Sequence, residues 1–173
     1  MVVLLLASCL KPAPPTAAAS PVPVSVAVVL ASYDHPEVTP APDRVDDAIA
    51  AELTRRNLVP TTVEVGPPFT AARSTDARLT LLPDGARLLV ECAPRFDAQV
   101  NGRYRWTVAV DATIDAGRGS TGASRAFSVP VHLSYDHERE PEALSDAAPI
   151  GAREIGRLLD DWVASGAGAA STD

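Results

Sequence analysis

The sequence predicts an α+β domain: an antiparallel or mixed β-sheet of about four strands, with two helices packed on one of its faces. Predicted segments follow the order strand, helix, three strands, helix. Residues 104–115 alternate six times between two faces, as in a half-buried antiparallel strand. Near the end of the chain, an apolar stripe with helical spacing predicts an amphipathic helix. We expect one domain over residues 24–165.

The first half of this domain is expected to hold one strand and one helix. Val24–Tyr33 is predicted as a strand that is apolar on both faces in its centre, as in strands covered on both sides. Residues 36–42 form a connection with three prolines. Asp43 is the expected N-cap of a helix over Arg44–Arg56, and Asn57 suits the left-handed conformation that ends helices. The apolar face of this helix comprises Val45, Ala48, Ile49 and Leu53.

The middle of the chain is expected to be strands and turns. Thr61–Val65 is predicted as a short strand, and Asp76–Leu82 as a strand that ends at a Pro-Asp-Gly turn. Arg87–Cys92 shows a period of two, which resumes at Phe96, Ala98 and Val100 after the interruption by Pro94. The strongest hairpin signal in the chain is Asn101-Gly102, a pair typical of two-residue turns.

The last third is expected to hold two strands and a helix. In residues 104–115 one face comprises Tyr104, Trp106, Val108, Val110, Ala112 and Ile114. The next strand has the inward residues Phe127, Val129, Val131, Leu133 and Tyr135, and its Pro130 indicates an edge position or a bulge. Residues 138–148 are predicted as an acidic connection, and Pro149 as the start of a helix over Ile150–Ala164. Its apolar face is Ile155, Leu158, Leu159, Trp162 and Val163.

The N-terminus carries the pattern of a bacterial lipoprotein processing site. Leu6-Ala7-Ser8-Cys9 closes an apolar run and precedes a Pro/Ala-rich tract, so Cys9 is the predicted lipid attachment site. Residues 1–9 are then a signal segment whose basic start is truncated, because the first basic residue is Lys11. Alternatively, Cys9 is incidental to a short apolar N-terminus. Residues 10–23 are a predicted tether and residues 166–173 a disordered tail.

The resemblance to bacterial lipoproteins implies three acyl chains at Cys9. More than one acyl chain is enough for stable membrane anchoring. Leu10 stands where an aspartate would suggest retention in the inner membrane, so we expect the periplasmic face of the outer membrane.

Composition and charge limit the classes of ligand. The net charge of −7 argues against a nucleic-acid partner. Residues 66–133, with eight arginines and six carboxylates, are the only basic third and are compatible with an anionic ligand. With Cys9 assigned to lipid, Cys92 has no disulfide partner and is expected to be a buried, inert thiol.

A tetrapeptide, Ser-Tyr-Asp-His, ends both the first and the last predicted strand, at residues 32–35 and 134–137. If these strands lie side by side and parallel, the two copies meet at one edge of the sheet. His35, His137, Asp34 and Asp136 are then weak candidates for a divalent metal site. The plainer interpretation is two similar strand ends, because no paired ligand spacing such as HExxH is present.

No motif for catalysis is present, and we expect neither an enzyme nor a cofactor. The chain lacks GxSxG and lacks a Cys/His pair in a catalytic context. A binding surface is predicted instead at the Asn101-Gly102 hairpin, where Arg95, Arg103 and Arg105 should point to solvent. They form either an ordinary charged sheet face or a contact for an anionic group, a glycolipid phosphate or an acidic patch of a barrel wall.

The layout resembles the outer-membrane lipoproteins that partner the barrel of the lipopolysaccharide-assembly machinery. The similarity covers the lipobox, the order of elements, and Leu133-Ser134-Tyr135-Asp136 before an acidic entry to the last helix. It implies a non-catalytic assembly subunit bound to an envelope β-barrel. The competing hypothesis is a lipoprotein that activates or scaffolds a peptidoglycan synthase or an inner-membrane transporter, since such proteins share similar element orders.

Overall fold

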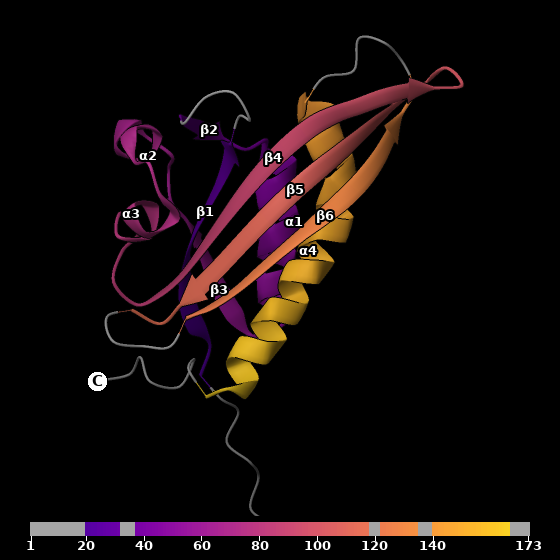
Figure 1. Ribbon diagram of the computed structural model, residues 1–173. Coiled ribbons are helices and arrows are strands. Elements are labelled where there is room, and N and C mark those ends of the chain that lie inside the picture. Colours follow the sequence, from indigo (N-terminus) through magenta and orange to yellow (C-terminus); the bar gives the residue numbers. More distant parts are fainter. Residues whose placement is uncertain (1–19, 32–36, 118–121, 135–139, 167–173) are drawn as a thin grey trace, which may run out of the picture.

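The computed structural model describes residues 20–31, 37–117, 122–134 and 140–166, and confirms the predicted α+β class (Figure 1). A sheet with the strand order β2-β1-β4-β5-β6 forms its centre, and β3 also pairs with β1. The six strands are β1 (Val22–Ala31), β2 (Val38–Pro40), β3 (Leu58–Thr62), β4 (Ala86–Val100), β5 (Arg103–Asp115) and β6 (Ala123–Leu133). The count exceeds the expected four because two short strands share one edge of β1: β3 pairs with its first half and β2 with its end.

The sheet is mixed. β1 runs parallel to β3 and β4, because chain connections containing helices separate these strands in sequence. β4, β5 and β6 form an antiparallel meander, as the alternating pattern predicted. β6 lies at the end of the strand order and pairs through Pro130 with Thr107, so the predicted edge position of Pro130 is confirmed.

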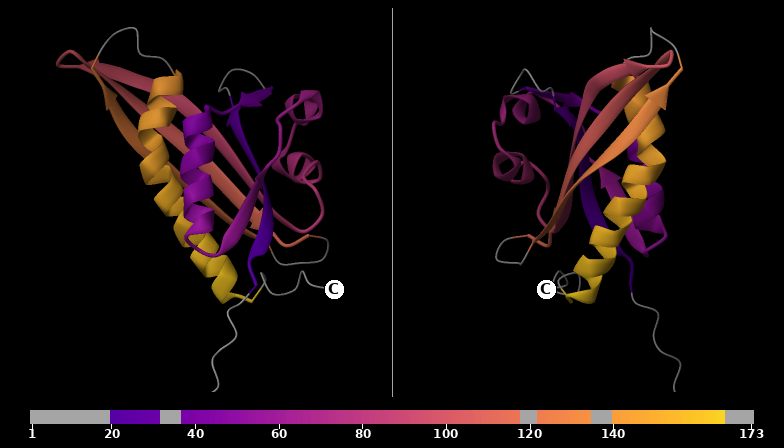
Figure 2. Two further views of the ribbon diagram at one scale, coloured as in Figure 1. Left: turned by 180° about the vertical axis from the view of Figure 1, so that it is seen from behind. Right: turned by 45° about the vertical axis from the view of Figure 1, so that its right-hand side comes forward.

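Two helices pack side by side on one face of the sheet, as predicted: α1 (Asp43–Thr54) and α4 (Glu140–Ala164) (Figure 2). Together with the sheet they enclose the main apolar core, in which Trp162 is 1% exposed. The opposite face is covered near β1 by two short helices, α2 (Pro67–Ala71) and α3 (Thr75–Leu79), over a smaller apolar cluster. β1 is therefore buried on both faces, as its sequence indicated.

The predicted strand over Asp76–Leu82 is wrong, because this segment begins with helix α3. The hydroxyl of Ser74 accepts a hydrogen bond from the backbone N–H of Ala77, which is an N-cap contact. Leu79 from this turn then packs into the smaller cluster. A helix of five residues is too short to show a helical period, and the spacing of its apolar residues also fits a strand.

The predicted start of the last helix is also wrong. α4 begins at Glu140, so most of the expected acidic connection is helical, and Pro149 lies inside the helix. An interior proline costs about 3 kcal/mol. Burial of the apolar residues on either side offsets that cost: Ala143, Leu144, Ala147, Ala148 and Ala152. Val163, expected on the apolar face, is 47% exposed.

The ends of α1 and β3 differ slightly from the expectation. Asp43 lies in the first turn of α1 and Pro42 is the N-cap residue, with no side-chain capping bond. Asn57 has a φ of +59°, which confirms the left-handed end. β3 follows at once, three residues earlier than the predicted strand at 61–65.

Candidate functional site

The β4–β5 hairpin closes with the two-residue turn that its sequence predicted. Asn101 and Gly102 have φ angles of +52° and +74°, as a type I′ turn requires. Val100 pairs with Arg103 across the turn. The hairpin tip lies at the end of the sheet away from the start of β1 and extends past the first turn of α4 (Figure 1).

A β-bulge near the tip decides which residues share a face. Phe96 lies opposite Trp106, whereas Ala98 lies opposite Arg105, so Asp97 is the extra residue. Because residues directly opposite each other share a face of the sheet, Ala98 faces the same side as Arg105. The expected alternation to the end of β4 is therefore wrong beyond Phe96: the bulge shifts the following residues to the other face.

All three predicted site arginines are exposed, and two of them share one carboxylate. Arg95 Nη2 lies 3.1 Å, and Arg105 Nε 3.6 Å, from the carboxylate oxygens of Asp97. The hydroxyl of Thr107 donates to the same carboxylate at 2.6 Å. The bonds from Thr107 and Arg95 lower the pKa of Asp97. The described residues supply no ion-pair partner for Arg103, whose guanidinium is the least compensated charge at the tip.

The face of the hairpin that turns toward α4 carries an aromatic cluster. The ring of Phe96 contacts Trp106 edge-on, with centroids 5.6 Å apart, and Tyr104 at 6.2 Å. Phe96 is 48% exposed although it is a large apolar side chain. The hairpin tip therefore presents arginines on one face and aromatic rings on the other, a combination that is common in protein interfaces. Tyr104 and Trp106 pack partly buried against the main core, whereas the exposure of Phe96 was not predictable from the alternation.

The proposed meeting of the two Ser-Tyr-Asp-His copies is not supported, because β4 and β5 lie between β1 and β6. β1 and β6 run parallel but are not neighbours. Asp34, His35, Asp136 and His137 lie outside the described residues. Within the described ranges, no three His, Cys, Asp or Glu side chains form a group that could hold a metal ion.

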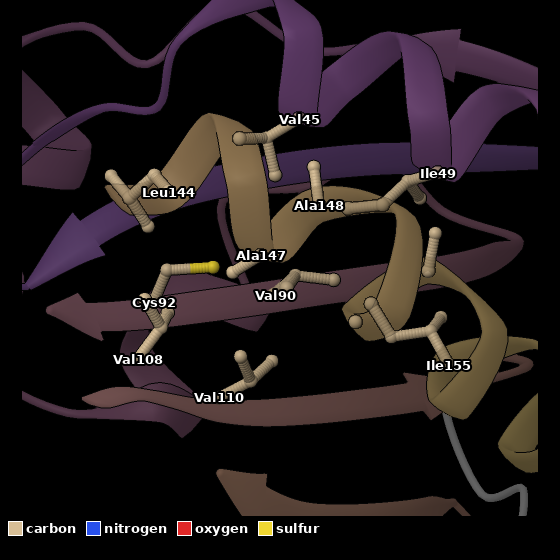
Figure 3. A pocket seen from close by; sticks show the side chains of 12 residues that line it. Val45, Ile49, Val90, Cys92, Val108, Val110, Leu144, Ala147, Ala148 and Ile155 are labelled. Carbon is tan, nitrogen blue, oxygen red and sulfur yellow. The ribbon is translucent and has the colours of Figure 1, made fainter. Parts of the chain in front are cut away.

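A second feature is an apolar hollow between α1, α4 and the sheet (Figure 3). Its cavity volume is only about 20 Å³, enough for about one water molecule and too small for a larger ligand. Its lining comprises Val45, Ile49, Val90, Cys92, Val108, Val110, Leu144, Ala147, Ala148, Gly151, Ala152 and Ile155. Burial raises the pKa of the Cys92 thiol to about 12, so this thiol is inert, as expected. Aliphatic side chains and a protonated thiol offer no groups for acid–base chemistry.

Two arginines of the basic middle third are buried in ion pairs, so they add no free positive surface. Arg78 pairs with Glu91 beneath α3, and Thr75 also donates to Glu91 at 2.5 Å. Arg87 forms a forked contact with Asp115, its Nη2 lying 3.0 and 2.8 Å from the two oxygens. Among the described arginines of this third, the three at the hairpin form the largest exposed group.

Asp46 of α1 has a pKa raised to about 6, first by burial and then by the nearby Asp43 and Asp47. Between pH 4 and pH 6 the folded chain therefore binds more protons at this site than the unfolded chain, and stability falls as the pH rises through that window. We expect Asp46→Asn to raise the free energy of unfolding at pH 7 by on the order of 1 kcal/mol, allowing for solvent screening of a half-buried group.

Urea unfolding at pH 4 and pH 7 measures this effect. The gain should shrink at pH 4, where Asp46 is protonated in the folded state. Asp161→Asn, at an exposed carboxylate of α4 that does not contribute to the pKa shift of Asp46, is the matched control and should change little. An equal gain in both variants would contradict the assignment to Asp46.

None of the described helices has the length and apolar content needed to cross a membrane. No family model matches the sequence, and no curated protein matches it. Several solved bacterial structures are similar at low identity. A minor lipoprotein from Acinetobacter baumannii is 13% identical, over 79% of this chain and 89% of the other, with a TM-score of 0.43.

Lipoprotein GNA1162 from Neisseria meningitidis is 14% identical, over 79% and 99% of the two chains, with a TM-score of 0.46. The rare lipoprotein B from Shewanella oneidensis is 10% identical, over 82% and 95%, with a TM-score of 0.34. These structural neighbours are bacterial lipoproteins, at levels of similarity too low to establish a common family or activity.

Proposed function

We propose that this chain is a lipoprotein anchored through Cys9 to the periplasmic face of the outer membrane, where it serves as a non-catalytic, partner-binding subunit. The lipobox pattern Leu6-Ala7-Ser8-Cys9 supports the anchor. The observation that carries the binding role is the exposed β4–β5 hairpin tip with its arginine and aromatic faces.

The geometry separates the anchored end from the binding end. Val24 of β1 pairs with Ala86 at the start of β4, whereas the hairpin follows Val100 at the end of β4. These fourteen steps along one strand span about 45 Å at the usual rise per residue. A chain tethered before β1 would thus hold the hairpin tip well away from its point of attachment, where it can reach a partner.

The partner that fits the tip best is an envelope protein with an acidic, partly apolar surface. Arg103 and the exposed ring of Phe96 would supply the strongest contacts, since arginine and aromatic side chains dominate interface energies. An outer-membrane β-barrel of the lipopolysaccharide-assembly machinery is the partner we propose. A glycolipid phosphate is a poorer fit, because Asp97 already occupies the guanidinium groups of Arg95 and Arg105.

A second candidate partner is another envelope protein, a peptidoglycan synthase or an inner-membrane transporter, because the lipoproteins that activate or scaffold such proteins share similar element orders. Purification of the lipidated chain from detergent-solubilised envelopes distinguishes these partners. A co-purified β-barrel supports lipopolysaccharide assembly, and a co-purified synthase or transporter supports the activating or scaffolding role.

Charge reversal of the hairpin tests the binding surface itself. We expect Arg95→Glu, Arg103→Glu and Arg105→Glu combined to weaken partner binding at least tenfold, because attraction to an acidic surface becomes repulsion. The melting temperature should change little, since exposed ion pairs contribute little to stability. Affinity is measured by titrating the purified variant against the partner.

The matched control reverses three exposed arginines elsewhere, at Arg44, Arg73 and Arg153, and alters the net charge by the same amount. The control should bind normally. Unchanged affinity in the hairpin variant, with an unchanged melting temperature, would show that the hairpin arginines are ordinary surface residues.

A further inference from the structure

Among the described strands, β6 leaves one edge of the sheet unpaired. β6 is the terminal strand, eleven residues long, and its described strand partner is β5 alone. The other side of the sheet is better protected, because β2 and β3 together cover the outer edge of β1. Unpaired N–H and C=O groups along such an edge can pair with a strand from another chain.

The position of Pro130 shows which backbone groups face this edge. Proline has no N–H and is tolerated in a sheet where that group would face away from the neighbouring strand. Backbone groups alternate between the two sides of a strand, so residues of the same parity also direct N–H and C=O outward. In the stretch Ala123–Val129, which contains neither proline nor lysine, these residues are Ser124, Ala126 and Ser128.

We propose that Ala123–Val129 pairs antiparallel with the same segment of a second copy of this chain, around a two-fold axis at Ala126. Pairing centred there avoids Pro130 and places Ala126 opposite its own counterpart. On the uncovered face of the sheet, Ser124 would lie opposite Ser128 of the second copy. Such small side chains allow two strands to approach without a clash.

The side chains on the α4 face of this segment are complementary to themselves. Arg125 and Phe127 are equally distant from Ala126, so the two-fold axis brings each Arg125 beside Phe127 of the second copy. Both side chains are partly exposed. Arg125 donates to Glu154 of α4 at 3.1 Å through one terminal nitrogen, which leaves the flat face of its guanidinium available to an aromatic ring.

The adjoining surface of α4 also favours a protein occupant. Gly151 of α4 lies against the ring of Phe127, and the preceding residue, Ile150, is 43% exposed. A second copy on the β6 edge would cover Phe127 and approach Ile150, and so remove apolar surface from water. This two-copy interface does not include the hairpin. The hairpin tip lies beyond Leu133, at the end of β6 away from Ala123.

Sedimentation velocity over a concentration series tests the proposal, with the full chain carrying Cys9→Ser so that lipid is absent. The chain should dimerise. Ala126→Pro should weaken dimerisation about tenfold or more, because it removes the outward N–H at the centre of both strands. Ala126→Ser keeps that N–H and is the matched control. At concentrations where the parent is monomeric, both variants should retain its melting temperature, since the β5–β6 ladder is untouched.

A cross-link provides a test that does not depend on weakening the fold. In the paired copies the two Cα atoms at position 126 should be about 5.5 Å apart, within the range of a disulfide. Ala126→Cys should therefore form a disulfide-linked dimer under mild oxidation. Asp111→Cys, also exposed but on β5, one strand in from the edge, should not.

The outcomes separate the proposal from its rivals. A chain that stays monomeric at all concentrations, or a dimer that forms equally well with Ala126→Pro, would overturn the two-copy interface. Cross-linking of Ala126→Cys in cells to a different envelope protein would also overturn it and would assign the edge to a strand of that protein. Unchanged partner affinity in the hairpin variant, together with an intact dimer, would count against the proposed function only.

Discussion

Trp162→Ala should lower the free energy of unfolding by about 3–5 kcal/mol, the usual cost of truncating a large buried aromatic side chain. Trp162 is 1% exposed and belongs to the main core, in the last turns of α4. Its removal would leave a cavity between α4 and the elements beneath it, and neighbouring side chains could fill that cavity only in part. Urea unfolding followed by far-ultraviolet circular dichroism measures the loss.

The neighbouring residue offers a matched control for this experiment. Val163 is 47% exposed in the same helical turn, so Val163→Ala should change the free energy of unfolding by less than about 0.5 kcal/mol. A similarly small change for Trp162→Ala would mean that the C-terminal part of α4 does not dock on the sheet as described.

Under the proposed anchoring, Cys9→Ala should move the protein from the outer-membrane fraction to the soluble periplasmic fraction and abolish labelling by radioactive palmitate. The expected effect is close to all-or-none, because each buried methylene of an acyl chain contributes about 0.8 kcal/mol to membrane binding and a lipoprotein carries three chains. Alanine has no thiol to which lipid can be attached. Fractionation and labelling of the same cells give the two measurements.

Cys92→Ala is the control for the loss of a cysteine as such. Cys92 is buried and uncharged, so its replacement should leave both the fractionation and the labelling unchanged. If Cys9→Ala still sedimented with the outer membrane and still took up palmitate, the lipobox interpretation would be wrong.

The candidate site was partly predictable because its turn is encoded locally. Asn101-Gly102 suffices for the two-residue turn, and the turn places Val100 opposite Arg103 whatever surrounds it. The exposure of the three arginines follows from their parity. The bulge at Asp97 could not be predicted, because it is held by contacts across β5, including the hydrogen bond from Thr107. That bulge decides which side chains accompany the arginines.

The aromatic face and the apolar hollow depend on how elements end and pack. Tyr104 and Trp106 have the pattern of core residues, and they are partly exposed because the hairpin extends past α4. The hollow exists where small residues of α4, such as Ala147 and Gly151, face α1 and β4. The extension of the hairpin past α4 and the packing of α1 against α4 both depend on contacts between distant segments. Neither can be predicted from the sequence of one segment.

The sequence by itself determined the α+β class, the β4–β5–β6 meander and the packing of α1 and α4 on one face of the sheet. Alternation and helical spacing show, within a single segment, which side chains are buried. Only the tertiary structure decided the extent of α4 and the nature of α3. Burial of Leu144 and Ala148 offsets the cost of Pro149, and the cluster around Leu79 stabilises a turn too short to show a period. The separation of β1 from β6 was likewise decided by strand pairing between distant segments, which no local pattern contains.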